Sequence, residues 1–506
     1  MKTYISRYWI LIISVILGFG LRYWASMTQP IFSDEAFSIY EARFWDFPYD
    51  PSYPPGYPLL LKLWTGASTN LFWARLPSVL AGTLSLIIFW QTLKKHVNLR
   101  SANLGVFLLA TSSLHLHYTW VARPGGITAL ITVLSLSQLL GLADSLKSKV
   151  RLNPLPLILY LATNTLGAFV CHGFTLFLAG SLTALIIWIF RVGAWRETIR
   201  NNKTGIGILA THILLPIMQY AFVHARISPL VDSADWIPDF NFYSITSAFL
   251  TLFNGAKTLT SEMWTAAPIT IFFSLIGIII ICRMLWATLY KRVMFLGILF
   301  VTVIVASLLG TMAVHTIFDM NILQPRLLMG IHIMYITGLS ITLPSFFRIT
   351  PKSQAVRLLH TYELMFIAVL LGFWVRSLFL LNIFPYYNDQ YAIHIVQSMK
   401  NDTQSTVLVF PRYQILTVKY LWGLDNPYPT SLLVADKSNR LPQNATAEAF
   451  RALMPEGTPI KIIRWPSDAT LSSGAQEFVN QLAPFCQKQQ YRNIDILDCP
   501  SLPQQH

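Results

Sequence analysis

The feature that most constrains the fold is a series of apolar segments that recurs along the first three quarters of the chain. Most are close to the ~20 residues that an α-helix needs to cross a hydrocarbon core. They lie at residues 8–25, 76–93, 102–120, 124–143, 155–170, 173–191, 205–222, 267–286, 294–313, 327–344 and 361–381. With 54% hydrophobic residues and a mean hydropathy of +0.50, the chain has more apolar surface than a globular core can bury. The sequence therefore predicts an α-helical polytopic membrane protein with about 11 transmembrane helices.

Two of these segments allow more than one interpretation. The first, "YWILIISVILGFGLRYWA", could also be a secretory signal, but it lacks a small-residue cleavage site and many equally apolar segments follow it. We therefore expect a retained helix. The run from residue 154 to 191 is too long for one span, and we expect a tight outer turn at Cys171, His172 and Gly173 to divide it.

The lysine and arginine residues indicate the topology. With the N-terminus inside, Lys2, Arg7 and the alternate connections hold 18 of the 37 Lys and Arg residues, which is the positive-inside pattern. Those connections contain only Asp144 and Glu197 as acids. The acids on the outer side before residue 381 are Asp34, Glu35, Glu41, Asp46, Asp50, Asp232, Asp235, Asp239, Glu262 and Asp319. Carboxylate chemistry is therefore expected outside, and the net charge of +14 requires no nucleic-acid partner.

The tail at residues 382–506 is predicted to be an extracytoplasmic α/β domain, because an odd number of spans returns the chain to the outer side. The segments "STVLVF", "SLLVAD", "IKIIRW" and "NIDILDC" resemble strands, and "TAEAFRAL" and "AQEFVNQLAPFCQ" resemble amphipathic helices. Cys486 and Cys499 lie in this tail, where an oxidising compartment would favour a disulfide and a pair of free thiols is the alternative. We expect domains at 1–381 and 382–506, with long outer loops at 26–75 and 223–266.

The outer loop at residues 26–75 is rich in aromatic residues and proline. Nine Phe, Tyr and Trp residues lie between positions 32 and 57, and five prolines lie between positions 48 and 58. Aromatic rings prefer the boundary between lipid and water. The loop is therefore expected to contain short helices that lie at the membrane interface.

The same loop carries the adjacent acids Asp34 and Glu35. Neighbouring side chains on a helix diverge by ~100°, so the two cannot point at one substrate atom. They also lack the separation of the paired carboxylates in glycosidases. We expect one acid to react and the other to support it. The alternative is that both are solvated acids, or that they lie at a helix N-terminus capped by Ser33.

A series of motifs in fixed order resembles a known family. They are "SDEA", "YPPGYPLLLKLW", "ARLPSVLAG" and "SSLHLHYTWVARPGGITAL", followed by "CHGF" and "QPRLLMGIHIMYITGL". The order is similar to that of polytopic glycosyltransferases with the C-type fold, in particular glycosyltransferase family 39. That family includes protein O-mannosyltransferases and the aminoarabinose transferase of lipid A. The resemblance implies a multi-pass enzyme of the bacterial inner membrane, with its N-terminus cytoplasmic and its C-terminal domain periplasmic. It would transfer a sugar from a polyprenyl-phosphate donor to a lipid, glycan or protein hydroxyl.

The resemblance also implies roles for individual residues. Asp34 would be the catalytic base, which takes the acceptor proton as the oxygen attacks and inverts the anomeric carbon. A polyprenyl phosphate leaves as a stable anion, so it needs cations rather than a second carboxylate. The candidates for this phosphate are Arg75, Arg123 and Arg326, because a guanidinium donates hydrogen bonds in pairs. For Arg75, the alternative is a side chain that extends to the lipid headgroups.

Other polar residues are weaker candidates. His172, Tyr53 and Lys62 are expected substrate contacts, although several relatives have His or Lys where this chain has Tyr53. His115 and His117 lie two residues apart, hence on different faces of a helix, so we expect packing or interface roles for them.

Motifs for other chemistries are absent from the sequence. There is no Walker sequence, no zinc-type Cys/His spacing and no Asp-x-Asp in the first loop, so neither a cofactor nor a metal is predicted. Two other functions stay open, a transporter or flippase for lipid-linked glycans and a non-catalytic envelope assembly protein. Transporters place ionisable residues within spans or show related halves, whereas these spans are nearly free of acids. A glycosyltransferase is therefore favoured.

Overall fold

The computed structural model describes residues 2–43, 54–147 except 69, 154–192, 294–318, 329–346, 406–410, 459–464, 473–491 and 494–499, together with a few single residues. The chain forms two compact units. The first comprises Met1–Met27 and Asp46–Phe384, and the second comprises Thr28–Trp45 and Pro385–His506.

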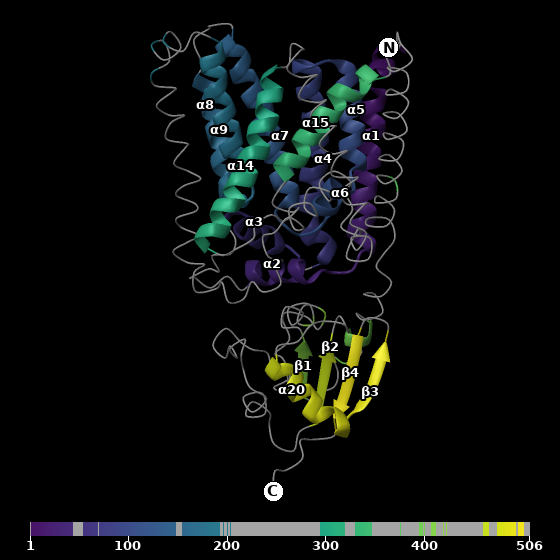
Figure 1. The fold of residues 1–506 in the computed structure, drawn as a ribbon. Coiled ribbons are helices and arrows are strands. Elements are labelled where there is room, and N and C mark those ends of the chain that lie inside the picture. The colour runs from purple at the N-terminus through teal and green to yellow at the C-terminus, as the bar shows by residue number, and fades with distance from the viewer. Residues whose placement is uncertain are drawn as a thin grey trace, which may run out of the picture. The chain divides into compact units, whose positions relative to one another are not determined.

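The first unit is a bundle of helices (Figure 1). In its described part, the helices are α1 (Lys2–Thr28), α3 (Gly56–Thr65), α4 (Leu71–His96), α5 (Leu99–Thr111), α6 (Ser113–Trp120), α7 (Gly125–Lys147), α8 (Pro154–Val170), α9 (Phe174–Arg191), α14 (Met294–Phe318) and α15 (Met329–Phe346). By length and composition, α1, α4, α7, α9 and α14 could each cross a membrane, and α5, α8 and α15 are shorter apolar helices. The predicted spans at 205–222, 267–286 and 361–381 lie outside the described residues.

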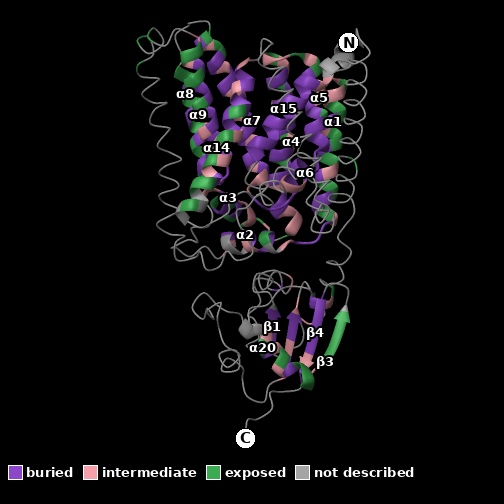
Figure 2. Cartoon of the chain, in the orientation of Figure 1, coloured by how far each residue is buried: buried purple, intermediate pink, exposed green. Residues whose placement is uncertain are grey.

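The outer surface of this bundle is apolar. Figure 2 shows exposed residues along α1 and α8, while α5, α7 and α15 are largely buried. The exposed side chains on α1 and α8 include Trp9, Ile12, Ile13, Ile16, Leu155, Ile158, Leu159 and Leu166. Such a surface is stable only in contact with lipid, so the prediction of a polytopic helical membrane protein is confirmed.

One predicted span is interrupted. The expectation of a single helix at 102–120 is wrong, because α5 ends at Thr111 and α6 begins at Ser113. Ser112 has an extended backbone, and its hydroxyl accepts a hydrogen bond from the backbone N–H of His115 at 3.3 Å. This side chain replaces a lost helical acceptor, which is the role of an N-cap. The break brings the polar residues at the start of α6 into the bundle interior.

The predicted division between α8 and α9 is confirmed. α8 ends at Val170 and α9 begins at Phe174, so the turn contains the expected residues Cys171, His172 and Gly173. The backbone N–H of Phe174 donates to the carbonyl of Cys171 at 3.1 Å, and the Thr175 hydroxyl donates to the carbonyl of His172 at 2.6 Å. These bonds satisfy backbone groups that a free helix end would leave unpaired.

Contacts near the C-terminus of α4 indicate the directions of its neighbours. Near its C-terminus, the Lys94 ammonium donates to the Tyr8 hydroxyl at 3.1 Å, so α1 and α4 are antiparallel. There too, His96 contacts the Asp144 carboxylate of α7 at 2.9 Å. α4 and α7 are therefore parallel, and the C-termini of α1 and α6 lie beside the N-termini of α4 and α7. We call this part of the molecule the site end of the bundle.

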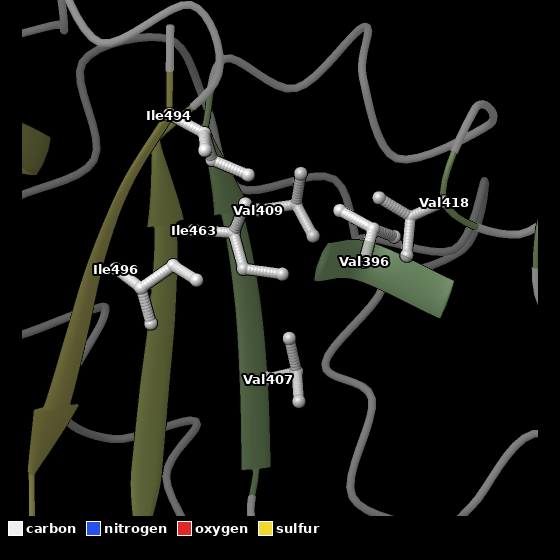
Figure 3. Packing of buried hydrophobic residues seen from close by; sticks show 7 residues of the cluster. All are labelled: Val396, Val407, Val409, Val418, Ile463, Ile494 and Ile496. Atoms are coloured by element: carbon white, nitrogen blue, oxygen red, sulfur yellow. The ribbon is translucent and has the colours of Figure 1, made fainter. Parts of the chain in front are cut away.

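The second unit contains a four-stranded sheet with the order β1-β2-β4-β3. β1 (Thr406–Phe410) is parallel to β2 (Ile460–Arg464), whereas β4 (Ile494–Cys499) pairs antiparallel with both β2 and β3 (Gln487–Tyr491). One face packs against Val396 and Val418 through Val407, Val409, Ile463, Ile494 and Ile496 (Figure 3). The predicted strands at 405–410, 460–465 and 493–499 are confirmed, and "SLLVAD" and "TAEAFRAL" lie outside the described residues.

The end of the predicted last helix is wrong. α20 (Ser473–Leu482) stops five residues before Gln487, a short 3-10 helix follows at Ala483–Phe485, and β3 begins at Gln487. Pro484 cannot donate a helical hydrogen bond, which explains the stop. Residues 487–490 are exposed and polar, so they lack the alternating pattern by which a strand is recognised.

Cys486 and Cys499 form a disulfide that joins the start of β3 to the end of β4, across 13 positions of sequence. Replacing both cysteines with serine is expected to lower the free energy of unfolding of this unit by about 3 kcal/mol, because a loop of this length restricts the unfolded chain. Hydrogen exchange of the β4 amides in the full-length protein measures this loss. Cys171→Ala, which removes a buried free thiol in the bundle, is the control. Unchanged protection of β4 in the double variant would contradict the expectation.

Candidate functional site

A pair of tryptophans anchors the outer loop to the site end of the bundle. Pro77 lies inside α4 and has no N–H, so the carbonyl of Trp73, four residues earlier, lacks its helical donor. The indole N–H of Trp64 on α3 donates to that carbonyl at 2.8 Å, and the indole of Trp73 donates to the carbonyl of Trp64 at 3.0 Å. The two rings stack with their centroids 4.7 Å apart. This reciprocal pair holds α3 against the beginning of α4.

Arg75 lies one turn into α4 and is completely buried. Its Nη1 donates to the carbonyl of Ser26 at the end of α1, at 2.8 Å. The guanidinium also lies over the indole of Trp120, the last residue of α6, 4.8 Å from the ring centroid. The side chain is therefore inside the bundle rather than extended to the lipid headgroups. It connects α4 to the C-terminal ends of α1 and α6.

Arg123 lies in the connection between α6 and α7 and is only 8% exposed. Its backbone N–H donates to the carbonyl of Val121 at 2.7 Å, which forms a tight turn. Its own carbonyl accepts from the Ser78 hydroxyl of α4 at 3.1 Å. A Cβ on Gly126 would lie 2.6 Å from the carbonyl oxygen of Ser78, so only glycine allows this close approach of α7 to α4. These contacts hold the backbone of Arg123 one turn along α4 from Arg75.

Asp34 and Glu35 occupy the first turn of α2 (Ser33–Arg43), which belongs to the second unit. Asp34 is exposed, whereas Glu35 is completely buried and its Oε2 accepts from the backbone N–H of Phe32 at 3.5 Å. Negative charge at this end of a helix interacts favourably with its dipole. The two acids thus differ in environment, because Asp34 is exposed and Glu35 is buried.

The structure describes two of the other four predicted contacts. Lys62 is on the exposed side of α3, and His172 is half-buried in the turn between α8 and α9. Tyr53 and Arg326 lie outside the described residues. Among the residues that the structure describes, the site end brings together Arg75 and Arg123, while Asp34 and Glu35 share the first turn of α2.

Sequence reasoning missed the residues that hold these arginines in place. Ser78 and Trp120 lie within apolar segments and Ser26 directly follows one, and no local pattern marks them. Arg22 was also missed, although it is completely buried within α1. A lone arginine inside an apolar span is a recognisable signal, because burying a charge there is costly.

The described residues contain no group of three or more His, Cys, Asp or Glu side chains that could hold a metal ion. The side chains described at the site end include those of arginine, serine and tryptophan.

Comparisons with solved structures identify the fold. The apo crystal structure of ArnT from Cupriavidus metallidurans aligns over 100% of both chains, with a TM-score of 0.56 and 11% identity. The structure of ArnT bound to undecaprenyl phosphate covers 98% of each chain, with a TM-score of 0.53 and 12% identity. The archaeal oligosaccharyltransferase AglB from Archaeoglobus fulgidus, in complex with an inhibitory peptide and a dolichol-phosphate, covers 91% of this chain and 70% of its own, with a TM-score of 0.50 and 12% identity.

These alignments confirm the expected C-type architecture, in which a helical membrane bundle is combined with a smaller C-terminal domain. No protein-family model and no curated protein sequence matches the chain. At 11–12% identity, the likeness concerns the path of the backbone and not the identity of the side chains.

Proposed function

We propose that this protein is an integral membrane glycosyltransferase that moves a sugar from a polyprenyl-phosphate donor to an acceptor hydroxyl, with inversion at the anomeric carbon. The reaction takes place on the outer face of a bacterial inner membrane. The observation that carries this proposal is the end-to-end likeness to a structure of ArnT that holds undecaprenyl phosphate. The AglB structure, which holds a dolichol-phosphate, supports the same class of donor lipid.

The phosphate of the donor binds at the site end of the bundle. Arg75 and Arg123 approach this end from α4 and from the α6–α7 connection, and their backbones are one helical turn of α4 apart through Ser78. Two guanidinium groups in a water-poor environment stabilise a phosphate monoanion or dianion strongly, because little solvent screens them. Arg326, His172, Tyr53 and Lys62 are further contacts of the donor or acceptor in this proposal.

The leaving group explains why one carboxylate is enough. When the bond between the anomeric carbon and the bridging phosphate oxygen breaks, the electron pair goes to that oxygen, and polyprenyl phosphate leaves as a stable anion. No acid needs to protonate it. The acceptor hydroxyl does need a base, because the attacking oxygen loses its proton as it bonds to the anomeric carbon.

Asp34 is that base, and Glu35 supports it. The exposure of Asp34 leaves its carboxylate accessible to an acceptor, while the buried Glu35 fixes the first turn of α2 through Phe32. Only four residues connect the end of α1 at Thr28 to the beginning of α2 at Ser33. In this proposal, Asp34 acts on the same donor sugar whose phosphate is bound by Arg75 and Arg123.

The test is a turnover experiment with purified full-length protein in proteoliposomes. The donors are a panel of undecaprenyl-phosphate hexoses and pentoses, and the acceptors are an envelope lipid and glycan extract and a hydroxyl-containing peptide. Mass spectrometry measures the released undecaprenyl phosphate and the glycosylated product. We expect time-dependent release that depends on the acceptor.

Two outcomes would overturn the proposal. Movement of the intact donor between leaflets without release would indicate a flippase. Neither release nor movement with any donor, in protein that remains folded, would favour a non-catalytic assembly protein.

A further inference from the structure

A second buried arginine, Arg22, lies on α1 one helical turn before Ser26, the residue whose carbonyl accepts from Arg75. Arg22 is completely buried, and its Nε donates to the Thr119 hydroxyl of α6 at 2.8 Å. Its Nη1 donates to the carbonyl of Gly18 at 2.6 Å, and its Nη2 donates to Nδ1 of His115 at 2.5 Å. In the described part of the chain, no carboxylate forms an ion pair with Arg22. A full positive charge is therefore held in the bundle by neutral acceptors.

The partners of Arg22 extend the network to α4. Because a guanidinium can only donate, Nδ1 of His115 is the acceptor and the ring proton is on Nε2. Nε2 lies 3.2 Å from the Ser85 hydroxyl, which in turn donates to the carbonyl of Gly82 at 2.7 Å. One side chain on α1 is thus connected to α6 directly and to α4 through His115.

This network also requires close contact between α4 and α6. A Cβ on Gly82 would lie 2.5 Å from the Cβ of Thr119 and 3.0 Å from Nε of Arg22. Only glycine at this position lets the two helices approach closely enough for Thr119 and Arg22 to meet. The packing of three helices is therefore specified at this level of the bundle.

The same three helices hold Arg75 in place. Ser26, which accepts from Arg75, lies four residues after Arg22 on α1, and Trp120, which lies under its guanidinium, directly follows Thr119 on α6. A shift of α1 against α6 would therefore move the two groups that hold Arg75. Arg22 therefore holds α1 against α6, and residues that follow on these two helices, Ser26 and Trp120, hold the side chain of Arg75.

We propose that Arg22, together with His115 and Thr119, is a positioning residue that holds Arg75 in the geometry needed for the donor phosphate. This inference rests on the proposed function. Arginine suits the role because its planar fork reaches Thr119, Gly18 and His115 in fixed directions. Lysine would keep the charge but could not bond all three acceptors in this arrangement.

The test compares the binding of fluorescent undecaprenyl phosphate by full-length variants. Arg22→Met and Arg22→Lys are each expected to weaken binding by about 10-fold, because misplacement of a phosphate ligand has effects of this order. Thr119→Val, which removes only one of the three hydrogen bonds of Arg22, is expected to have a smaller effect of the same kind. In an Arg75→Ala background, Arg22→Met should cause little further loss, because its effect passes through Arg75.

A matched control is Asn164→Leu, which removes a buried bond between α7 and α8, in which the Ser135 hydroxyl donates to Asn164 at 2.7 Å. It is expected to lower thermal stability without changing the Kd. If Arg22→Met fails to fold, Thr119→Val and Arg22→Lys provide the same comparison.

The outcomes separate this inference from the proposed function. Wild-type binding by Arg22→Met or, where that variant does not fold, by Arg22→Lys, together with weak binding by Arg75→Ala, would overturn the role of Arg22 alone. If Arg22→Met weakened lipid binding by the same factor in the wild type and in the Arg75→Ala background, that result would also overturn the role of Arg22. Failure of the wild type to bind undecaprenyl phosphate would overturn both proposals.

Discussion

Replacing Asp34 with asparagine is expected to lower the rate of sugar transfer by about 10²- to 10⁴-fold, the range that a general base contributes. Asparagine has nearly the same size and shape, but it cannot take a proton from the acceptor hydroxyl. Asp34 is exposed in the first turn of α2, so the change should cost at most about 1 kcal/mol of stability through the helix dipole. Single-turnover release of undecaprenyl phosphate measures the rate, and binding of the donor should remain normal.

Two other carboxylates serve as controls for Asp34. Asp144→Asn changes an exposed acid beside His96, at the opposite end of α4 from Arg75, and should leave transfer unchanged. Glu35→Gln keeps an acceptor for the backbone N–H of Phe32, so a smaller loss is expected than for Asp34→Asn. Full activity of Asp34→Asn, or a larger loss in Glu35→Gln, would assign the base elsewhere.

The second large effect is expected at Arg123. Replacing it with alanine should weaken the binding of undecaprenyl phosphate by about 10- to 100-fold, because hydrogen bonds to charged groups contribute about 1.5–3 kcal/mol. The backbone contacts of residue 123 with Val121 and Ser78 do not involve the side chain, so the turn should persist. Arg123→Lys keeps the charge without the paired donors and should bind with intermediate strength. Titration of the purified variants with the fluorescent lipid gives the Kd values.

Arg100→Ala is the matched control for Arg123. Arg100 is an exposed cation near the beginning of α5, close to the end of α4 that carries Lys94 and His96. Its removal lowers the net charge equally but leaves the site end unchanged, so binding should be that of the wild type. Similar losses in both variants would show that overall charge, and not a phosphate contact at Arg123, controls binding.

Much of the helix bundle could be predicted because lipid imposes a simple pattern. A span must be apolar over about 20 residues, so hydropathy located α1, α4, α7 and α14. The turn at Cys171–Gly173 followed from length alone, because the run from 154 to 191 exceeds one span. The break at Ser112 could not be found in this way, because a serine cap leaves an apolar run apolar.

The candidate site was less predictable, because its contacts join residues far apart in the chain. Arg75 is held by Ser26, 49 positions before it, and Arg22 by Thr119, 97 positions after it. A single sequence gives no indication of such pairs, and for Arg75 it left headgroup contact as an equal alternative. In the tail, the polar edge strand β3 was missed because an exposed edge needs no apolar alternation. The residue types indicated the chemistry of the site, but only the structure showed which of these residues lie close together.

In the proposed mechanism, one carboxylate and two arginines act on the same phosphate-linked sugar. A cryo-electron microscopy structure of Asp34→Asn with a bound undecaprenyl-phosphate sugar tests it most directly, because this variant should hold the donor without consuming it. We expect the phosphate oxygens within hydrogen-bonding distance of Arg75 or Arg123, and the side chain of residue 34 on the opposite side of the anomeric carbon. A donor phosphate bound away from both arginines, or a residue 34 that faces away from the sugar, would contradict the account.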